Sequence, residues 1–216
     1  MELSKLFLDR NFGNNFKAIA YQNMQIALKA FEQFKIKNKS FFHFDKKEVL
    51  FGHLLTYSVE KQFCDSAFTP TAEYSVSMKQ VNKYGYKTLC IDTEDFIMNI
   101  GRSPKPTVLP SVSSYKINFA KSNKDIDSQL EFQFENNEIS KVTNEKKYAL
   151  LTYGYKLGAL EHFSLVIPSN DYKSILYSDN LLLNISDYDN YTPKEEIEES
   201  IVRLKNSIET ELERII

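Results

Sequence analysis

Hydrophobic residues near the start of the chain recur at steps of three and four residues. Between residues 14 and 36 these positions fall on one side of an α-helix, which has 3.6 residues per turn. They are Phe16, Ala20, Met24, Ala27, Phe31 and Phe34. Asn14 or Asn15 is placed to cap the start of this helix, and Asn38 is expected to end it.

A second helix is predicted over residues 46–63. Asp45 is placed as its N-cap, and Glu48 follows three residues later, as in a capping box. We expect the two helices to form one helical layer, with His53 as a hydrogen-bonded core histidine. The residues on the predicted buried face are Val49, Leu50, His53, Leu54 and Tyr57.

From residue 68 to about residue 186 the hydrophobic period changes from 3.6 to 2, which is typical of strands. The first two predicted strands form a hairpin around the polar turn 92–95, and a second hairpin turns across 154–158. This region therefore predicts a mostly antiparallel sheet. Its strands are expected at 86–91, 96–100, 130–135, 148–153, 160–167 and 181–185.

A proline-rich connector interrupts the predicted sheet. Pro104, Pro106 and Pro110 are excluded from helix interiors and central strands. We expect residues 103–110 to form a stiff connector, followed by a short helix from Ser111.

The last segment predicts a long amphipathic helix. Thr192 is placed as the N-cap, Pro193 at the first helical position and Glu195 in a capping box. The helix carries a narrow apolar stripe of Ile197, Ile201, Leu204, Ile208 and Leu212. This stripe predicts either packing on the N-terminal helices or a surface for a protein partner or a second copy of the chain.

These patterns together predict an α+β fold with an N-terminal helical layer, a central mostly antiparallel sheet and a long C-terminal amphipathic helix. We expect a single α+β domain over residues 1–191, with helices to about residue 66 and mainly strands over 68–186. Residues 192–216 are expected to form the terminal helix.

Composition places the chain among globular proteins. Hydrophobic residues make up 42% of it, and 16 Phe with 13 Tyr predict an aromatic core. The net charge of −2 lacks the basic excess of a general nucleic-acid binder. Lysines far outnumber the four arginines, which indicates an AT-rich bacterium or its phage as the source.

The expected location is the cytoplasm. Cys64 and Cys90 form no CxxC pair, and free thiols are typical of reducing compartments. The first residues lack a long apolar signal region, and no window of 18 apolar residues predicts a membrane span.

The acidic turn 92–95 predicts one candidate catalytic group. Asp92 and Glu131 supply the hard oxygen ligands that Mg²⁺ or Mn²⁺ prefers, and Lys146 or Lys147 supplies a positive charge. The set resembles the PD-(D/E)xK nuclease pattern, which implies metal-dependent phosphodiester cleavage. It departs from that pattern because no Pro precedes Asp92 and Gln133 stands where the lysine is expected. The alternative is a solvated hairpin turn.

A strand exit at residues 100–105 is a candidate anion site. Gly101 allows close approach, and Arg102 and Lys105 supply positive charge. The alternative is an ordinary strand exit with solvated basic residues.

An aromatic and basic segment lies at residues 83–87. Lys83 and Lys87 flank Tyr84 and Tyr86, which is a pattern that stacks on and neutralises single-stranded nucleic acid. The alternative is cross-strand packing. The string Tyr-Gly-Tyr-Lys recurs at 153–156, which predicts two turns of similar chemistry.

Other cofactor signals are lacking in the sequence. The three histidines and two cysteines have no metal-ligand spacing, and the six glycines form no phosphate loop. We therefore expect no metal or cofactor, apart from Mg²⁺ or Mn²⁺ if the nuclease alternative holds.

The favoured function is that of a non-enzymatic interaction or regulatory protein that binds a protein partner. The terminal amphipathic helix supports this hypothesis. The first alternative is a metal-dependent nuclease or related phosphoryl-transfer enzyme. The second is a DNA-binding regulator that uses the N-terminal helices.

Overall fold

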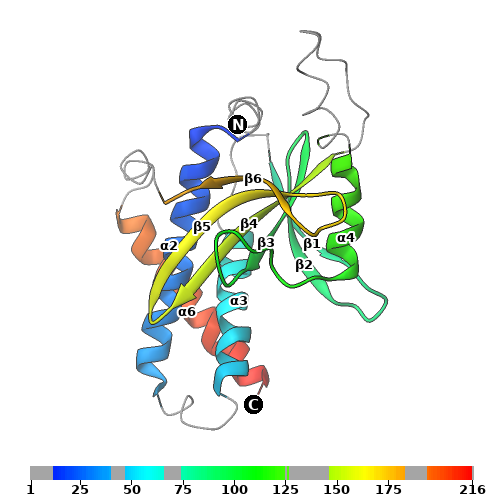
Figure 1. Cartoon of the computed structure of the whole chain (residues 1–216). Helices are drawn as coiled ribbons and strands as arrows, with labels where there is room; N and C mark the ends of the chain where they lie inside the picture. Colours follow the sequence, from blue (N-terminus) through cyan, green and yellow to red (C-terminus); the bar gives the residue numbers. More distant parts are fainter. Residues whose placement is uncertain are drawn as a thin grey trace. The chain divides into compact units, whose positions relative to one another are not determined.

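The computed structural model describes residues 12–39, 47–65, 74–124, 126, 146–182 and 194–215. The fold is α+β, as predicted: two N-terminal helices, a six-stranded mostly antiparallel sheet and a C-terminal helix (Figure 1). The chain gathers into a helical unit, Asn14–Phe68 with Asn184–Ile216, and a sheet unit, Met1–Gly13 with Thr69–Leu183. The predicted single domain over residues 1–191 stays a prediction.

The helical unit consists of α2 (Asn14–Lys37), α3 (Lys47–Asp65) and α6 (Lys194–Ile215). α2 ends where predicted, because Asn38 donates from both its backbone N–H and its side-chain amide to the carbonyl of Phe34. The C-terminal helix α6 packs on α2 and α3. A buried hydrogen bond from Gln62 Nε2 to Asn23 Oδ1 (3.0 Å) joins α3 to α2.

The buried face of α3 differs from the predicted one. Val49 is 75% exposed and His53 is exposed too, so the prediction of a core histidine was wrong. The buried face includes two polar residues, Ser58 and Gln62, whose side chains are satisfied by hydrogen bonds. The prediction counted only hydrophobic residues, and it therefore placed the buried face of α3 part of a helical turn away from the observed one. Its buried residues are Leu54, Leu55, Ser58, Val59, Gln62 and Phe63.

The sheet runs in the order β1-β2-β3-β4-β5-β6. All neighbouring strands are antiparallel except β3 and β4, which are parallel and connected by α4 (Ser114–Ala120) and a short 3₁₀ helix, η2 (Lys121–Asn123). The strands are β1 (Ser75–Gln80), β2 (Lys87–Asp92), β3 (Phe96–Arg102), β4 (Lys147–Lys156), β5 (Ala159–Pro168) and β6 (Ile175–Asn180).

Both predicted hairpins are present, with a change in the second. Its turn is only Leu157-Gly158, and Gly154 lies inside β4. The first Tyr-Gly-Tyr-Lys string lies in the β1–β2 turn and ends on Lys87, the first residue of β2, whereas the string at 153–156 lies inside β4. The prediction of two similar turns was therefore wrong.

Other predicted strands have different outcomes. Residues 130–135 lie outside the described residues. The last described strand is β6, and Leu181 and Leu182, predicted to begin a strand at 181–185, form the turn that follows it. Residues 183–185 lie outside the described residues. The short helix predicted from Ser111 begins at Ser114.

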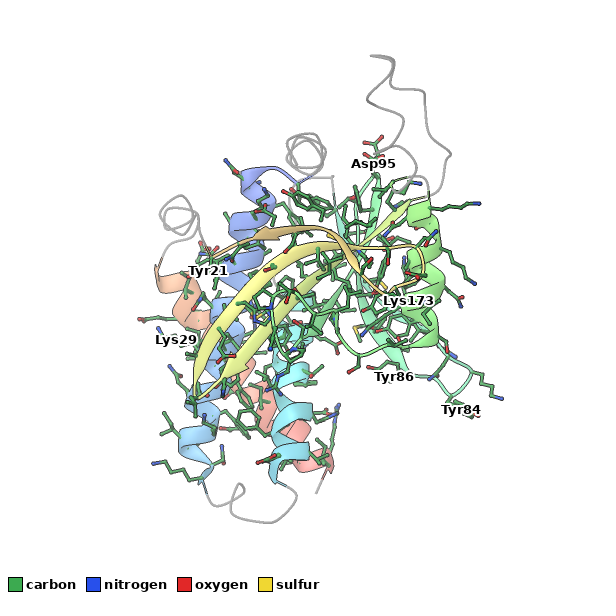
Figure 2. All side chains as sticks on the ribbon, in the orientation of Figure 1. Tyr21, Lys29, Tyr84, Tyr86, Asp95 and Lys173 are labelled. Carbon is green, nitrogen blue, oxygen red and sulfur yellow. The ribbon has the colours of Figure 1, made fainter. Side chains whose placement is uncertain are left out.

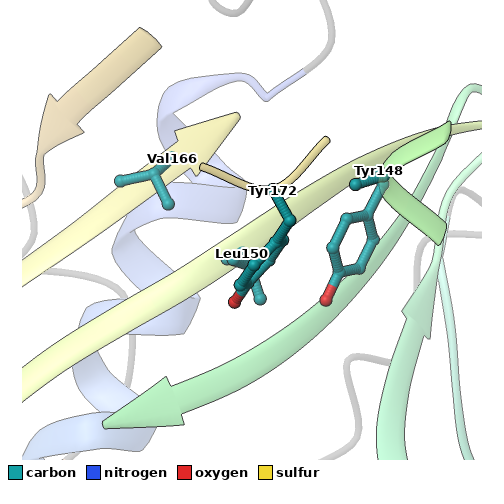
Figure 3. Close-up of a cluster of buried hydrophobic side chains, with 5 residues drawn as sticks. Tyr148, Leu150, Val166 and Tyr172 are labelled. Carbon is teal, nitrogen blue, oxygen red and sulfur yellow. The ribbon is translucent and has the colours of Figure 1, made fainter. Parts of the chain in front are cut away.

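The core beside α4 is aromatic. Tyr148 and Tyr172 pack with Leu150, Val166 and Ala120, and Figure 3 shows the two rings side by side over β4. The side chain of Asn123, in η2, joins the helical connection to β4 and β5. It accepts a hydrogen bond from Tyr148 N and donates to the carbonyls of Tyr148 and Pro168, all at 2.8–2.9 Å.

None of the described helices is both long enough and apolar enough to cross a lipid bilayer.

Candidate functional site

The structure brings together two of the predicted catalytic residues. Asp92, at the end of β2, lies 3.8 Å from Lys146 Nζ. Lys79 Nζ approaches the same carboxylate more closely, at 2.7 Å, and the Asp92 side chain is only 13% exposed. Asp92 therefore lies between two lysines, Lys79 on β1 and Lys146 just before β4.

The other two predicted catalytic residues are placed differently. Lys147 Nζ donates to the carbonyl of Ser122 (2.8 Å), at the end of η2, where a cation interacts well with a helix C-terminus. Glu131 lies outside the described residues. Within the described parts of the chain, no group of three or more His, Cys, Asp or Glu side chains is arranged to hold a metal ion.

The predicted anion site is open to solvent. Arg102 and Lys105 are both exposed, and the Arg102 guanidinium donates to the carbonyl of Tyr155 (3.1 Å). This bond directs Arg102 toward the end of β4. The backbone close to Gly101 is crowded, because a Cβ there would lie 2.8 Å from Cγ of Pro110.

A serine–histidine pair that sequence patterns do not indicate lies next to Arg102. Ser103 Oγ and His162 Nε2 are 2.9 Å apart, and Ser103 Oγ also donates to the carbonyl of Lys105 (3.0 Å). Both residues are only 3% exposed, and burial lowers the pKa of His162. A substrate cannot reach these buried atoms. Their hydrogen bond has a structural role, because it joins the residue that follows β3 to β5.

The apolar stripe of α6 lies inside the helical unit. Ile201, Leu204, Ile208 and Leu212 are at most 4% exposed, and Ile197 is half-buried. Of the two predicted alternatives, packing on the N-terminal helices is therefore what the structure shows. A partner-binding role for the same residues stays a prediction.

Among the described residues, the most exposed aromatic side chains lie in the turn between β1 and β2. Tyr84 is 83% exposed and Tyr86 is 56% exposed. Asn82 Oδ1 accepts hydrogen bonds from the backbone N–H groups of both tyrosines, at 3.0 and 2.9 Å. Gly85 adopts a φ of 83°, which glycine permits at no steric cost. Figure 2 shows this turn extending away from the sheet.

Three connections share one end of the sheet. β2 and β3 are antiparallel, with Ile91 paired to Met98, so β2 begins at the end of the sheet where β3 ends. β3 and β4 are parallel, with Arg102 paired to Tyr153, so β4 ends there too. The β1–β2 turn, the loop after β3 and the β4–β5 turn therefore lie at this end, which we call the basic end. Its exposed large hydrophobic residues are Tyr84, Tyr86, Val108, Val112 and Leu157.

The basic end has a one-sided charge. Residues 81–91, 101–113 and 154–160 contain no Asp or Glu; Asp92 follows the first range at the far end of β2, and the exposed Glu161 follows the last range in β5. The opposite end carries the acidic turn with Asp92, Glu94 and Asp95, and Figure 2 shows Asp95 far from Tyr84. This end of the sheet therefore carries several basic residues, spread over three connections, although the net charge is −2. Its exposed basic residues are Lys83, Lys87, Arg102, Lys105 and Lys156.

Leu157 adds an unusual backbone feature to the basic end. It is 97% exposed and adopts a φ of 51° in the two-residue β4–β5 turn. Both the exposure of an apolar side chain and the left-handed backbone are unfavourable for leucine.

Comparisons with known proteins give no relative. No protein-family description matches the chain, and none of the curated proteins or solved structures matches it significantly.

Proposed function

We propose that the chain is a protein-interaction module that binds a protein partner through the basic end of the sheet. The single observation that carries this proposal is the joint exposure of Tyr84 and Tyr86 beside Lys83 and Lys87, in a segment (residues 81–91) that contains no Asp or Glu. Tyrosine is enriched in protein interfaces because it combines a large apolar surface with a hydrogen-bonding group.

The charge of the surface favours an acidic partner. Lys83 Nζ lies 5.1 Å from the centre of the Tyr84 ring, so the cation rests on an aromatic face. Opposite charge on a partner speeds encounter and excludes partners of like charge. An acidic protein surface is therefore the best match.

A second candidate function is the binding of single-stranded nucleic acid at the same surface. Exposed tyrosines between lysines favour it, because bases stack on aromatic rings and lysines neutralise phosphates. Both functions use the same residues, so the test must separate the two kinds of partner.

The test is capture of partners from a lysate of the source cell by the tagged chain, with and without nuclease. The wild type is compared with the variant Lys83→Glu/Tyr84→Ser/Lys87→Glu and with Lys173→Glu, which changes an exposed lysine in the β5–β6 turn at the other end of the sheet. A stoichiometric protein that survives nuclease and is lost only with the triple variant supports the proposal. Recovery of nucleic acid supports the second candidate, and equal capture by all three chains refutes both.

A further inference from the structure

The outer edge of β1 has backbone groups that point away from the sheet. Val81 N donates to Tyr86 O (2.9 Å), so residues 81 and 86 form a hydrogen-bonded pair. Hydrogen-bonded and non-hydrogen-bonded pairs alternate along an antiparallel ladder. From the observed register, Lys79 and Ser77 therefore face β2, while Gln80, Met78 and Val76 direct their backbone N–H and C=O groups outward.

No described strand pairs with this outer edge, since β1 is the first strand in the sheet order. Its side chains are exposed or half-buried along its whole length, and Met78 is 41% exposed. An edge of this kind is a template for an added strand.

Charge decides between the kinds of strand that fit there. Between Ser75 and Ile91 the chain carries three lysines and no carboxylate; Lys79 pairs with Asp92, so Lys83 and Lys87 supply the charge toward a partner. β1 itself carries one lysine and no carboxylate, so β1 of a second copy offers this edge no negative charge. An acidic strand gains from the same charges. Backbone N–H and C=O groups also match a peptide rather than a nucleic acid.

We propose that the edge of β1 accepts an extended acidic segment of a protein partner as a seventh strand of the sheet. Val76, Met78 and Gln80 form the backbone hydrogen bonds, and Lys83 and Lys87 face carboxylates of the added segment. Tyr84 covers the end of the segment near the turn. The inference deepens the proposed function and rests on it.

The test uses an eight-residue fluorescent peptide of alternating glutamate and valine, with a peptide of alternating lysine and valine as its control. The variant Met78→Pro removes an outward N–H that the β1–β2 ladder does not use, so proline is tolerated there as on other edge strands. Met78→Thr is the matched control, because it shortens the side chain and keeps the N–H. We expect the glutamate peptide to bind the wild type and Met78→Thr, and Met78→Pro to bind it at least about tenfold more weakly.

Hydrogen exchange on the wild type provides a measurement that does not depend on a variant. Addition of the glutamate peptide should slow exchange at the amides of Val76, Met78 and Gln80. Unchanged exchange at these amides overturns the inference, as does absence of peptide binding or preferential binding of the lysine peptide. Binding of oligo-dT that is insensitive to Met78→Pro, in place of the peptide, overturns it in favour of nucleic acid.

The inference can fail while the proposed function stands. If Met78→Pro captures the cellular partner as well as the wild type does, and the triple variant does not, the partner binds the turn without adding a strand. If neither variant loses the partner, both proposals fail.

Discussion

Gly154 illustrates how a single residue position depends on a distant neighbour. It pairs with His162 across β4 and β5, and a Cβ at this position would overlap the imidazole ring. The ring cannot move away easily, because it is buried and hydrogen-bonded to Ser103. Glycine is therefore required here by space and not by a turn.

We predict that Gly154→Ala lowers the free energy of unfolding by about 1–3 kcal/mol, the usual cost of overpacking. Gly52→Ala is the control, because nothing lies within 4 Å of its added Cβ and alanine favours helices. Urea denaturation of both variants checks the prediction. Equal stability of Gly154→Ala and the wild type would mean that the ring does not confine this position.

The pKa of His162 predicts a pH dependence of stability. Burial lowers this pKa in the folded chain, so the unfolded chain binds a proton more readily. The free energy of unfolding should therefore fall as the pH drops below about 6.5, the ordinary histidine value.

His162→Gln provides the comparison, because it removes the titrating ring and keeps a polar side chain. Chemical denaturation at about pH 7.5 and about pH 5.5 should show a smaller pH difference in this variant than in the wild type. An equal difference in both chains would assign the pH dependence to other groups.

Elements with one strongly buried face were predictable from sequence. The apolar residues of α2 recur at helical spacing, and β2, β4 and β5 include long runs of buried residues. The edge strand β1 was missed because Ser75–Gln80 has no fully buried position and therefore no clear alternation. The β6 strand was displaced for a similar reason, since its residues are only partly buried.

At the same scale, α6 separates buried from exposed apolar positions. Ile208 is fully buried in the helical unit, whereas Val202 on the same helix is 52% exposed. Ile208→Ala should lower the free energy of unfolding by about 2–5 kcal/mol, and Val202→Ala should have little effect. Thermal denaturation followed by circular dichroism measures both. Similar effects of the two substitutions would contradict the observed packing of α6.

The candidate site could be predicted only in pieces. The residue types at 83–87 and at 102–105 indicated binding of anions, and the predicted hairpin around 92–95 already implied that the start of β2 lies beside the end of β3. The sequence did not predict that the β4–β5 turn lies at the same end, because this depends on the parallel pairing of β3 with β4, whose partners are about fifty residues apart. The exposure of Leu157 was not predicted, because a leucine in a two-residue turn gives no periodic hydrophobic pattern that would separate it from a buried leucine.

For the whole molecule, we predict that binding depends on the basic end and on charge. Capture of the partner should weaken as salt is raised, because exposed lysines are screened within about 10 Å at 0.1 M ionic strength. Salt-independent capture would indicate an apolar contact elsewhere on the chain.

The most direct test of this account is the ratio of partner captured by Lys83→Glu/Tyr84→Ser/Lys87→Glu to partner captured by Lys173→Glu, in nuclease-treated lysate and at equal amounts of folded chain. The account predicts that the triple variant retains less than about one tenth of the partner, which corresponds to a loss of about 1.4 kcal/mol or more in binding free energy. The Lys173→Glu variant should retain nearly all of it. A ratio close to one would contradict the assignment of the basic end as the partner-binding surface.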